Sequence, residues 1–276
     1  SYTVIAKDAT SFSKGFFNKN PFQTNSHKHA LSHLFQNTSK LLFSRQSSTM
    51  LTYSTHHFDY KEFTGSTLLK TKSIPIAIGY SHFYTNSIIE TQRNSTSTRG
   101  IAIGSSFSHT IKSLHIATAY PLLKTLGVGG KIKVHQESLY NDSSTGLSID
   151  FSGYYKLRHW LNIGLYTENI FQINRIWKKS NTTESLEKNL VFDINAVHKY
   201  GNINYQAKAE LVKLASFWNI SKEFTLAIDH INNNDVKQNS VGLILDFFPF
   251  SCHYSLMMTN QNLGDNKHQF SILFQY

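Results

Sequence analysis

Seven charged or titratable residues fall on one face of extended segments, and they are the first candidates for function. They are Lys131, Lys133, His135, Asp150, Asp193, Lys208 and Glu210. Alternate residues of an extended chain share a face, so Lys131, Lys133 and His135 point one way while Ile132 and Val134 point the other. A charge enclosed away from water is costly unless it is paired or hydrated. These residues therefore indicate either ion pairs that bind an internal segment to a wall, or the lining of a substrate passage.

The fourteen histidines invite a catalytic or metal-binding interpretation, which their spacing does not favour. His27 and His29 are two residues apart and His56 and His57 are adjacent, and neither pair has a third ligand at a fixed spacing. The sequence has no HExxH or GxSxG motif and no phosphate-cradling loop. We therefore predict no enzyme activity, no metal site and no cofactor.

The elements that must position these residues are alternating segments of about ten residues, the length that crosses a bilayer at barrel tilt. The last of them, 267–276, places Phe270, Ile272 and Phe274 on one face, with Leu273 as an apolar exception on the other. The pattern predicts an all-β fold, an antiparallel transmembrane β-barrel of about 14 strands. The predicted strands are 48–58, 61–70, 74–85, 111–121, 126–140, 146–156, 160–171, 189–199, 203–212, 214–220, 223–231, 240–248, 251–259 and 267–276.

The connections between these segments alternate in length. Short ones are 71–73, 122–125, 157–159, 200–202, 221–222 and 249–250, and the long ones are 86–110, 141–145, 172–188, 232–239 and 260–266. Two connections on the long side, 59–60 and Lys213 alone, are short exceptions. Outer-membrane barrels have short periplasmic turns and long outer loops. The pattern therefore predicts a bacterial outer-membrane location with both termini periplasmic, and an even strand number agrees with this.

Composition is compatible with such a barrel. Hydrophobic residues make up 40% of the 276 residues, the mean hydropathy is −0.31, and no apolar run of about 18 residues suggests a membrane-spanning helix. The single cysteine, Cys252, excludes an internal disulfide. Because the chain opens on Ser1, we expect a mature form whose signal peptide has been removed, although an artificial N-terminus would look the same.

The net charge of +10 raises the question of nucleic-acid binding. The lysines are scattered, and no nucleic-acid-binding motif accompanies them, so we predict no nucleic-acid partner. Basic rims and loops fit the headgroups of membrane lipid and the phosphates of lipopolysaccharide. A compositional bias toward Lys and Asn without a binding role is an equally good explanation.

The first 46 residues lack the strand pattern and contain many aromatic side chains. We predict that 1–46 forms a plug inside a barrel made by 47–276, because the lumen of fourteen strands is too wide for wall side chains to fill. A short helix is expected at 29–35, and a flexible tail is the alternative, which the aromatic content disfavours. The plug residues we single out are Phe16, Phe17, Phe22, Leu34, Phe35 and Asn37.

Several segments resemble a known family of barrels. The stretch from His29 to Leu41, with Asn37 followed by Thr38 in place of proline, is similar to an Asn-Pro-Ala-like motif before the first strand. The segments 126–140, 146–155, 161–170 and 262–276 look like that family's central strands and its closing loop and strand. On these residues the chain resembles PorV/PorQ-type outer-membrane proteins, relatives of the FadL-like transporters of hydrophobic compounds.

The resemblance implies a fourteen-strand barrel with an internal N-terminal hatch. It also implies one of two roles, the transport of hydrophobic molecules or an accessory role in type IX protein secretion. In the first role the lumen would hold a hydrophobic ligand. In the second, the outer loops 86–110 and 172–188 would hold a protein partner. The sequence leaves both roles open.

Overall fold

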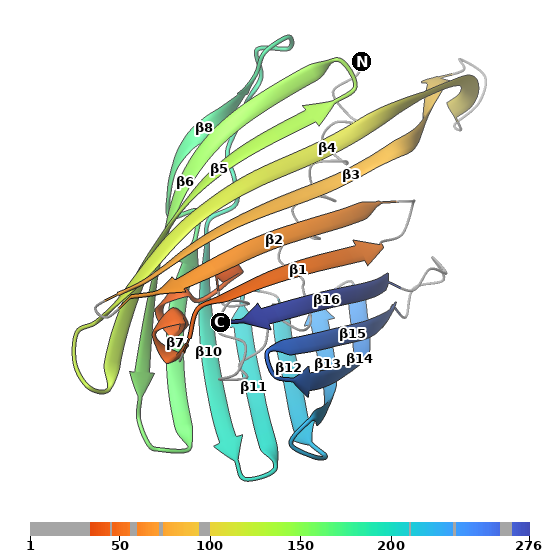
Figure 1. Ribbon diagram of the computed structural model, residues 1–276. Coiled ribbons are helices and arrows are strands. Elements are labelled where there is room, and N and C mark those ends of the chain that lie inside the picture. Colours follow the sequence, from red (N-terminus) through yellow and green to blue (C-terminus); the bar gives the residue numbers. More distant parts are fainter. Residues whose placement is uncertain are drawn as a thin grey trace.

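The strands form a closed antiparallel barrel (Figure 1). The computed structural model describes residues 34–44, 46–55, 60–71, 74–93, 100–209, 211–233, 236–259 and 267–276. Within these residues fourteen strands make the wall, which confirms the predicted fold class. They are β1 (Ser48–Thr55), β2 (Lys61–Lys70), β3 (Pro75–Arg93), β4 (Gly100–Pro121), β5 (Leu126–Leu139), β6 (Asp142–Lys156), β7 (Leu161–Glu168), β10 (Asn189–His198), β11 (Gly201–Lys208), β12 (Leu211–Asn219), β13 (Phe224–Asn233), β14 (Val236–Phe247), β15 (Phe250–Thr259) and β16 (Lys267–Gln275).

The barrel closes where its first and last strands meet. Ser48 pairs with Gln275 and Thr55 with His268 in an antiparallel register. The backbone N–H of Tyr276 also donates to the carbonyl of Ser47 at 3.0 Å. The predicted strand 267–276 is therefore the closing strand of the wall.

The two faces of the wall differ in polarity, in the sense opposite to a soluble protein. Outward side chains such as Ile78, Ile116 and Leu165 are exposed, whereas inward side chains such as Thr52 and Ser271 are buried. This exposed apolar band is the surface that a barrel presents to lipid. Among the described residues no helix is long and apolar enough to cross a membrane.

One side of the wall rises above the rest (Figure 1). The sequence predicted a loop at 86–110, but β3 continues to Arg93 and β4 begins at Gly100. The prediction of a second long loop at 172–188 is also wrong, because β8 (Phe171–Trp177) and the short β9 (Thr183–Glu184) lie there. The register between β3 and β4 shifts beyond Thr85, and the outward residues Ile173 and Ile176 of β8 are three positions apart. The two-residue alternation on which the strand prediction depended is therefore broken in these extensions.

Other boundaries also differ from the predictions. Strand β6 begins at Asp142, so the expected loop 141–145 is a tight turn. Lys213 is no connection but lies inside β12, where its side chain is buried. Strands β13 and β14 shorten the connection expected at 232–239. The end of the first predicted strand, 56–58, lies outside the described residues.

Part of the predicted plug lies inside the barrel. Residues 34–44, which we call the plug segment, include a 3-10 helix, η2 (Thr38–Phe43), that contacts β3, β4, β5 and β6. Leu34 and Leu41 are fully buried and pack in one cluster with Met50 and Leu68 of the wall, and with Leu273. The apolar exception at Leu273 is therefore explained, because this inward residue contacts an apolar plug. The predicted plug residues Phe16, Phe17 and Phe22 lie outside the described residues, and so do residues 29–33 of the helix expected at 29–35.

Candidate functional site

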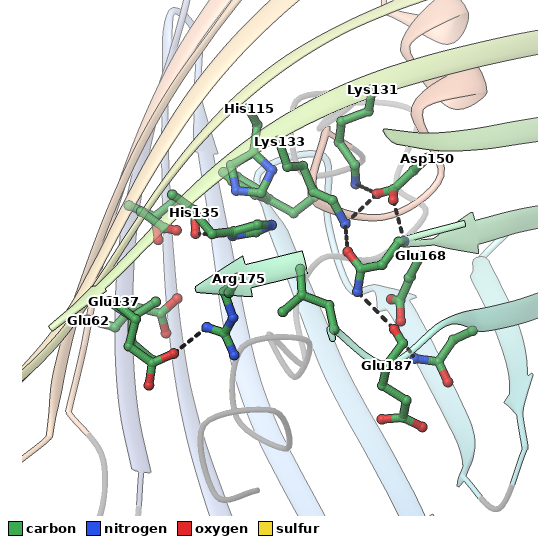
Figure 2. Close-up of a pocket in the computed structure, with 18 of the residues that line it drawn as sticks. Glu62, His115, Lys131, Lys133, His135, Glu137, Asp150, Glu168, Arg175 and Glu187 are labelled. Carbon is green, nitrogen blue, oxygen red and sulfur yellow. Dashed lines mark hydrogen bonds and ion pairs between the residues drawn. The ribbon is translucent and has the colours of Figure 1, made fainter. Parts of the chain in front are cut away.

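The lumen above the plug segment holds a cavity of about 130 Å³, which we call the chamber (Figure 2). We call the half of the lumen nearer the long connections the upper lumen, and the half nearer the short turns the lower lumen. The chamber is lined by side chains of β2–β8, β10 and β11, with Phe35 of the plug segment among them. An engineered apolar cavity of roughly 150 Å³ holds a benzene molecule, so the chamber suits a solute of similar size.

A cluster of two cations around one carboxylate forms one side of the chamber. The Lys133 ammonium lies 2.7 Å and the Lys131 ammonium 3.3 Å from the same oxygen of Asp150. Lys133 also donates to the Asn169 side chain at 2.6 Å, and the Asn169 backbone N–H donates to Asp150 at 2.6 Å. The three predicted residues Lys131, Lys133 and Asp150 are thus brought together, and their alternation on β5 and β6 points them inward.

Two histidines and a serine lie beside this cluster. His135 Nδ1 is 2.7 Å from the Ser113 hydroxyl, and the ring of His135 is 6.2 Å from that of His115. His115 in turn meets Phe35 edge to face at 5.0 Å. Among the described residues no group of three His, Cys, Asp or Glu side chains is arranged to hold a metal ion. Both His115 and His135 line the chamber.

A chain of hydrogen bonds crosses the upper end of the chamber. The Tyr60 hydroxyl lies 3.2 Å from His109 Nδ1, and His109 Nε2 lies 2.9 Å from Glu137, which also binds Arg175. Arg175 makes a second ion pair with Glu184 at 2.9 Å. Burial, and then the Glu137 carboxylate, raise the pKa of Tyr60 to about 12, so its hydroxyl remains protonated at physiological pH. This network ties β8 to β4 and β5.

The remaining predicted residues lie in different places. Lys208 lines the chamber and pairs with Glu168 at 2.7 Å. Asp193 does not line it. Asp193 instead binds Lys40 of the plug segment and accepts a hydrogen bond from Asn204 at 2.7 Å. Glu210 lies outside the described residues, and Leu34 and Asn37 belong to the buried plug segment, where Asn37 contacts the carbonyl of Gly153.

Sequence reasoning missed several residues of the interior. Glu137 follows His135 by two positions and continues the same face, so a longer application of the alternation would have found it. Arg175 was hidden in a predicted loop. The sequence pattern places Lys213 in a connection, whereas its side chain pairs with Asp229 at 3.4 Å inside the wall.

The wall is interrupted next to the chamber. The pairing between β7 and β10 ends at Glu168 and Asn189, whereas β6 continues to pair with β8 beyond that level. Between β7 and β8, Asn169 has a φ of 57° and bends the strand. The return segment 185–188 is held by Gln172, whose side chain bonds the backbone N–H and carbonyl of Leu186 at 2.7 and 2.8 Å. Here, within the described residues, side-chain contacts replace backbone pairing between β8 and β10.

Comparison with known proteins defines the class of fold. No protein-family model and no curated protein matches the chain. Among solved structures, a "CymD monoaromatic hydrocarbon channel" matches with a TM-score of 0.64 at 10% identity, over 89% of this chain and 93% of that one. The toluene transporter TbuX of Ralstonia pickettii matches with a TM-score of 0.61 at 8% identity, and a Pseudomonas aeruginosa FadL homologue with 0.55 at 9%. For both, the match covers 89% of this chain and 93% of the other.

The chain therefore shares the β-barrel fold of these solved structures. At these identities the likeness defines the architecture alone. The finer resemblance to PorV/PorQ-type proteins stays a prediction.

Proposed function

We propose that this protein is an outer-membrane channel for small hydrophobic molecules, with the chamber as its binding site. The observation that carries the proposal is a solute-sized cavity in the lumen, directly beside an interruption in the pairing of the wall. The fold shared with hydrocarbon channels supports it. So does the exposed apolar band, which suits a bacterial outer membrane, with the short turns and both termini on the periplasmic side.

The polar lining of the chamber favours one kind of hydrophobic solute. The lining combines the ammonium groups of Lys131 and Lys133 with the rings of His115 and His135. An aromatic ring offers its negative face to cations, with a gain of roughly 0.5–2 kcal/mol, whereas an alkane has no such face. A monoaromatic solute therefore suits this lining better than an alkane of equal volume does.

The proposal is tested by filling the chamber. Ser81→Trp places a large side chain at an inward position that lines the cavity, and Tyr80→Trp on the same strand changes an outward position. We expect uptake of labelled toluene into proteoliposomes to fall to the level of protein-free vesicles for Ser81→Trp, and to remain unchanged for Tyr80→Trp. Unchanged uptake in a correctly folded Ser81→Trp barrel would contradict the chamber as the site.

A second candidate function is docking, as an accessory subunit of a secretion or cell-surface complex. The observation that favours it is the raised wall, which presents exposed outward side chains at Ile89, Ile173 and Ile176. Their exposed fractions are 61%, 66% and 54%, and they lie in the regions predicted as outer loops. A partner recovered in stoichiometric amount from native membranes, and lost on Ile89→Ser with Ile173→Ser, would favour docking over transport.

A further inference from the structure

Two lysines on the outward face of the wall lack the carboxylate partners that inward lysines have. Inside the barrel, Lys131, Lys133 and Lys208 each pair with an acidic side chain. Lys112 on β4 and Lys61 at the start of β2 are exposed, and among the described residues neither pairs with a carboxylate. A cation at a lipid-facing surface is costly unless an anion lies beside it. An external anion therefore suits this surface.

These two lysines belong to a row of polar residues that crosses β2 to β5. Lys112 pairs in register with His82 on β3 and with Gln136 on β5. Lys61 pairs with Tyr84, which follows His82 on the same face of β3. We call these residues the polar belt, and none of them is buried. At the usual strand spacing and rise, the Cα atoms of Lys61 and Lys112 lie about 12 Å apart, so both ammonium groups can contact one lipid headgroup.

The polar belt lies at the upper edge of the exposed apolar band, where upper means nearer the long connections. On β4, Leu114 and Ile116 follow Lys112 on the outward face, and Tyr120 is the outward residue next to the short turn. From Tyr120 to Lys112 the strand rises about 27 Å, which is about 20 Å along the barrel axis at the usual tilt. The apolar band of an outer-membrane barrel is about 25 Å tall. Lys112 therefore lies at the level of the lipid headgroups.

The wall continues above the polar belt, and there β4 presents hydroxyl groups. Its next outward residues are Thr110, Ser108 and Ser106, and both serines are exposed. Strands β3 and β4 rise beyond the end of β2 at this place (Figure 1). Hydroxyl side chains donate and accept hydrogen bonds, as the hydroxyl groups of sugars do. A headgroup that carries sugars above its phosphates matches this order of side chains better than the small headgroup of a phospholipid does.

The charge of these strands favours an anionic ligand as well. From the polar belt down to the short turns, strands β2 to β5 carry a single acidic residue within the described chain, Glu62, and it lines the chamber. The outward face therefore presents cations to the membrane without competing carboxylates. Lysine ammonium groups bind phosphate as point charges.

We propose that the polar belt binds the phosphate groups of a lipopolysaccharide molecule in the outer leaflet. The acyl chains lie against Leu114 and Ile116, and the sugars lie against Ser108 and Thr110. This site is on the outside of the wall and is separate from the chamber. The inference rests on the proposed function only for its orientation, in which the long connections face away from the periplasm.

The test measures the Kd of bis-phosphorylated lipid A for the full-length barrel in detergent, by native mass spectrometry. Lys61→Gln combined with Lys112→Gln should weaken binding roughly 25-fold, because each lysine near an anionic surface contributes about fivefold. Lys61→Arg with Lys112→Arg keeps both charges and should retain the affinity. Lys124→Gln is the matched control, since it removes one charge at the short turn between β4 and β5, and it should leave the Kd unchanged. An equal Kd for the double glutamine variant and the unmodified protein would overturn the inference.

Two further lipids distinguish the possible sources of phosphate. Lipid A without phosphates tests the charge, and cardiolipin supplies two phosphates without a sugar pair. We expect both to bind the unmodified barrel several-fold more weakly than bis-phosphorylated lipid A does. Equal binding of either lipid would overturn the assignment to lipopolysaccharide.

The lipid site and the chamber can fail separately. Binding is measured in detergent and needs no transport, whereas toluene uptake depends on the chamber. The double glutamine variant should take up toluene like the unmodified protein, and its heat-modifiable gel mobility shows whether it is folded. Loss of uptake in this folded variant would contradict a site separate from the chamber.

Discussion

The upper and lower halves of the lumen are held together by different chemistry. In the upper lumen, charged side chains pair around a cavity, as Lys133 does with Asp150 and Lys208 with Glu168. In the lower lumen, a plug segment sits against glycines and hydroxyl groups, with one buried ion pair at its edge. A lining of charges around a cavity tolerates a guest. A close fit between backbone and plug does not tolerate a guest. Substitutions in the lower lumen should therefore lower the free energy of unfolding more than substitutions in the upper lumen.

The largest effect is expected at the buried ion pair of the lower lumen. Asp193→Ala removes the carboxylate that pairs with the buried Lys40 ammonium, and removing one member of such a pair costs about 3–5 kcal/mol. The free energy of unfolding, measured by urea titration of the barrel in lipid vesicles, should fall by that amount. Asp193→Leu combined with Lys40→Met removes both charges and should recover most of the loss. A double variant no more stable than Asp193→Ala would contradict the account.

The next largest effect on the free energy of unfolding is expected where the plug segment packs closely against a wall glycine. Gly129→Val places a Cβ atom 2.6 Å from the backbone nitrogen of Ser39 and should cost about 1–3 kcal/mol through overpacking. The adjacent Gly130 faces outward, and a Cβ atom there meets nothing within 4 Å. Gly130→Val is therefore the matched control and should unfold at the same urea concentration as the unmodified protein. Equal losses from both variants would show that strand strain, and not the plug, is responsible.

A smaller effect is expected in the upper lumen. Lys208→Met breaks the pair between Lys208 and Glu168 at the edge of the chamber. The Lys208 side chain is 19% exposed and the Glu168 side chain 9%. Pairs within reach of water contribute about 1 kcal/mol or less, so the free energy of unfolding should fall by no more than that. The urea titration used for Asp193→Ala gives the comparison directly. A loss as large as that of Asp193→Ala would remove the distinction between the two halves.

The smallest effect on stability is expected at the outer rim. Asp142 accepts hydrogen bonds from the backbone N–H groups of Lys179 and Ser180 at 2.8 and 3.0 Å, and so holds the turn after β8. Asp142→Ala should change the free energy of unfolding by only about 0.5 kcal/mol, as expected for an exposed site. Trypsin should nevertheless cut after Lys178 and Lys179 faster than in the unmodified protein. Asn141→Ala is the control and should leave the cleavage rate unchanged.

The sequence predicted the features that depend on a two-residue period. Lys131, Lys133 and Asp150 point into the barrel because their neighbours Ile132 and Ile149 face lipid, and this alternation is visible in the residues themselves. The predicted number of strands follows from the same two-residue period. Local patterning therefore sets both the wall and the direction of its side chains.

The features that the sequence did not predict depend on contacts between distant segments. Strand β8 pairs with β6, but its outward apolar residues Ile173 and Ile176 are three positions apart and show no two-residue period. The pattern therefore predicts neither β8 nor the inward position of Arg175. The position of Lys213 depends on where the turn before β12 falls, which a one-residue error in register hides. The contact between Lys40 and Asp193 joins residues 153 positions apart, and no periodicity in either segment reveals it.

The barrel can close only when β1 pairs with β16. Thr52 meets Ser271 across 219 residues, so the seam is one of the most non-local contacts in the molecule. Contacts between residues far apart in sequence form slowly, because the entropy of closing a long loop must be overcome first. A chain that lacks its final strand would leave β1 and β15 as open edges, each free to pair with another molecule. Assembly is thus completed only by the arrival of the last ten residues, and an unfinished copy is an aggregation hazard and not a smaller pore.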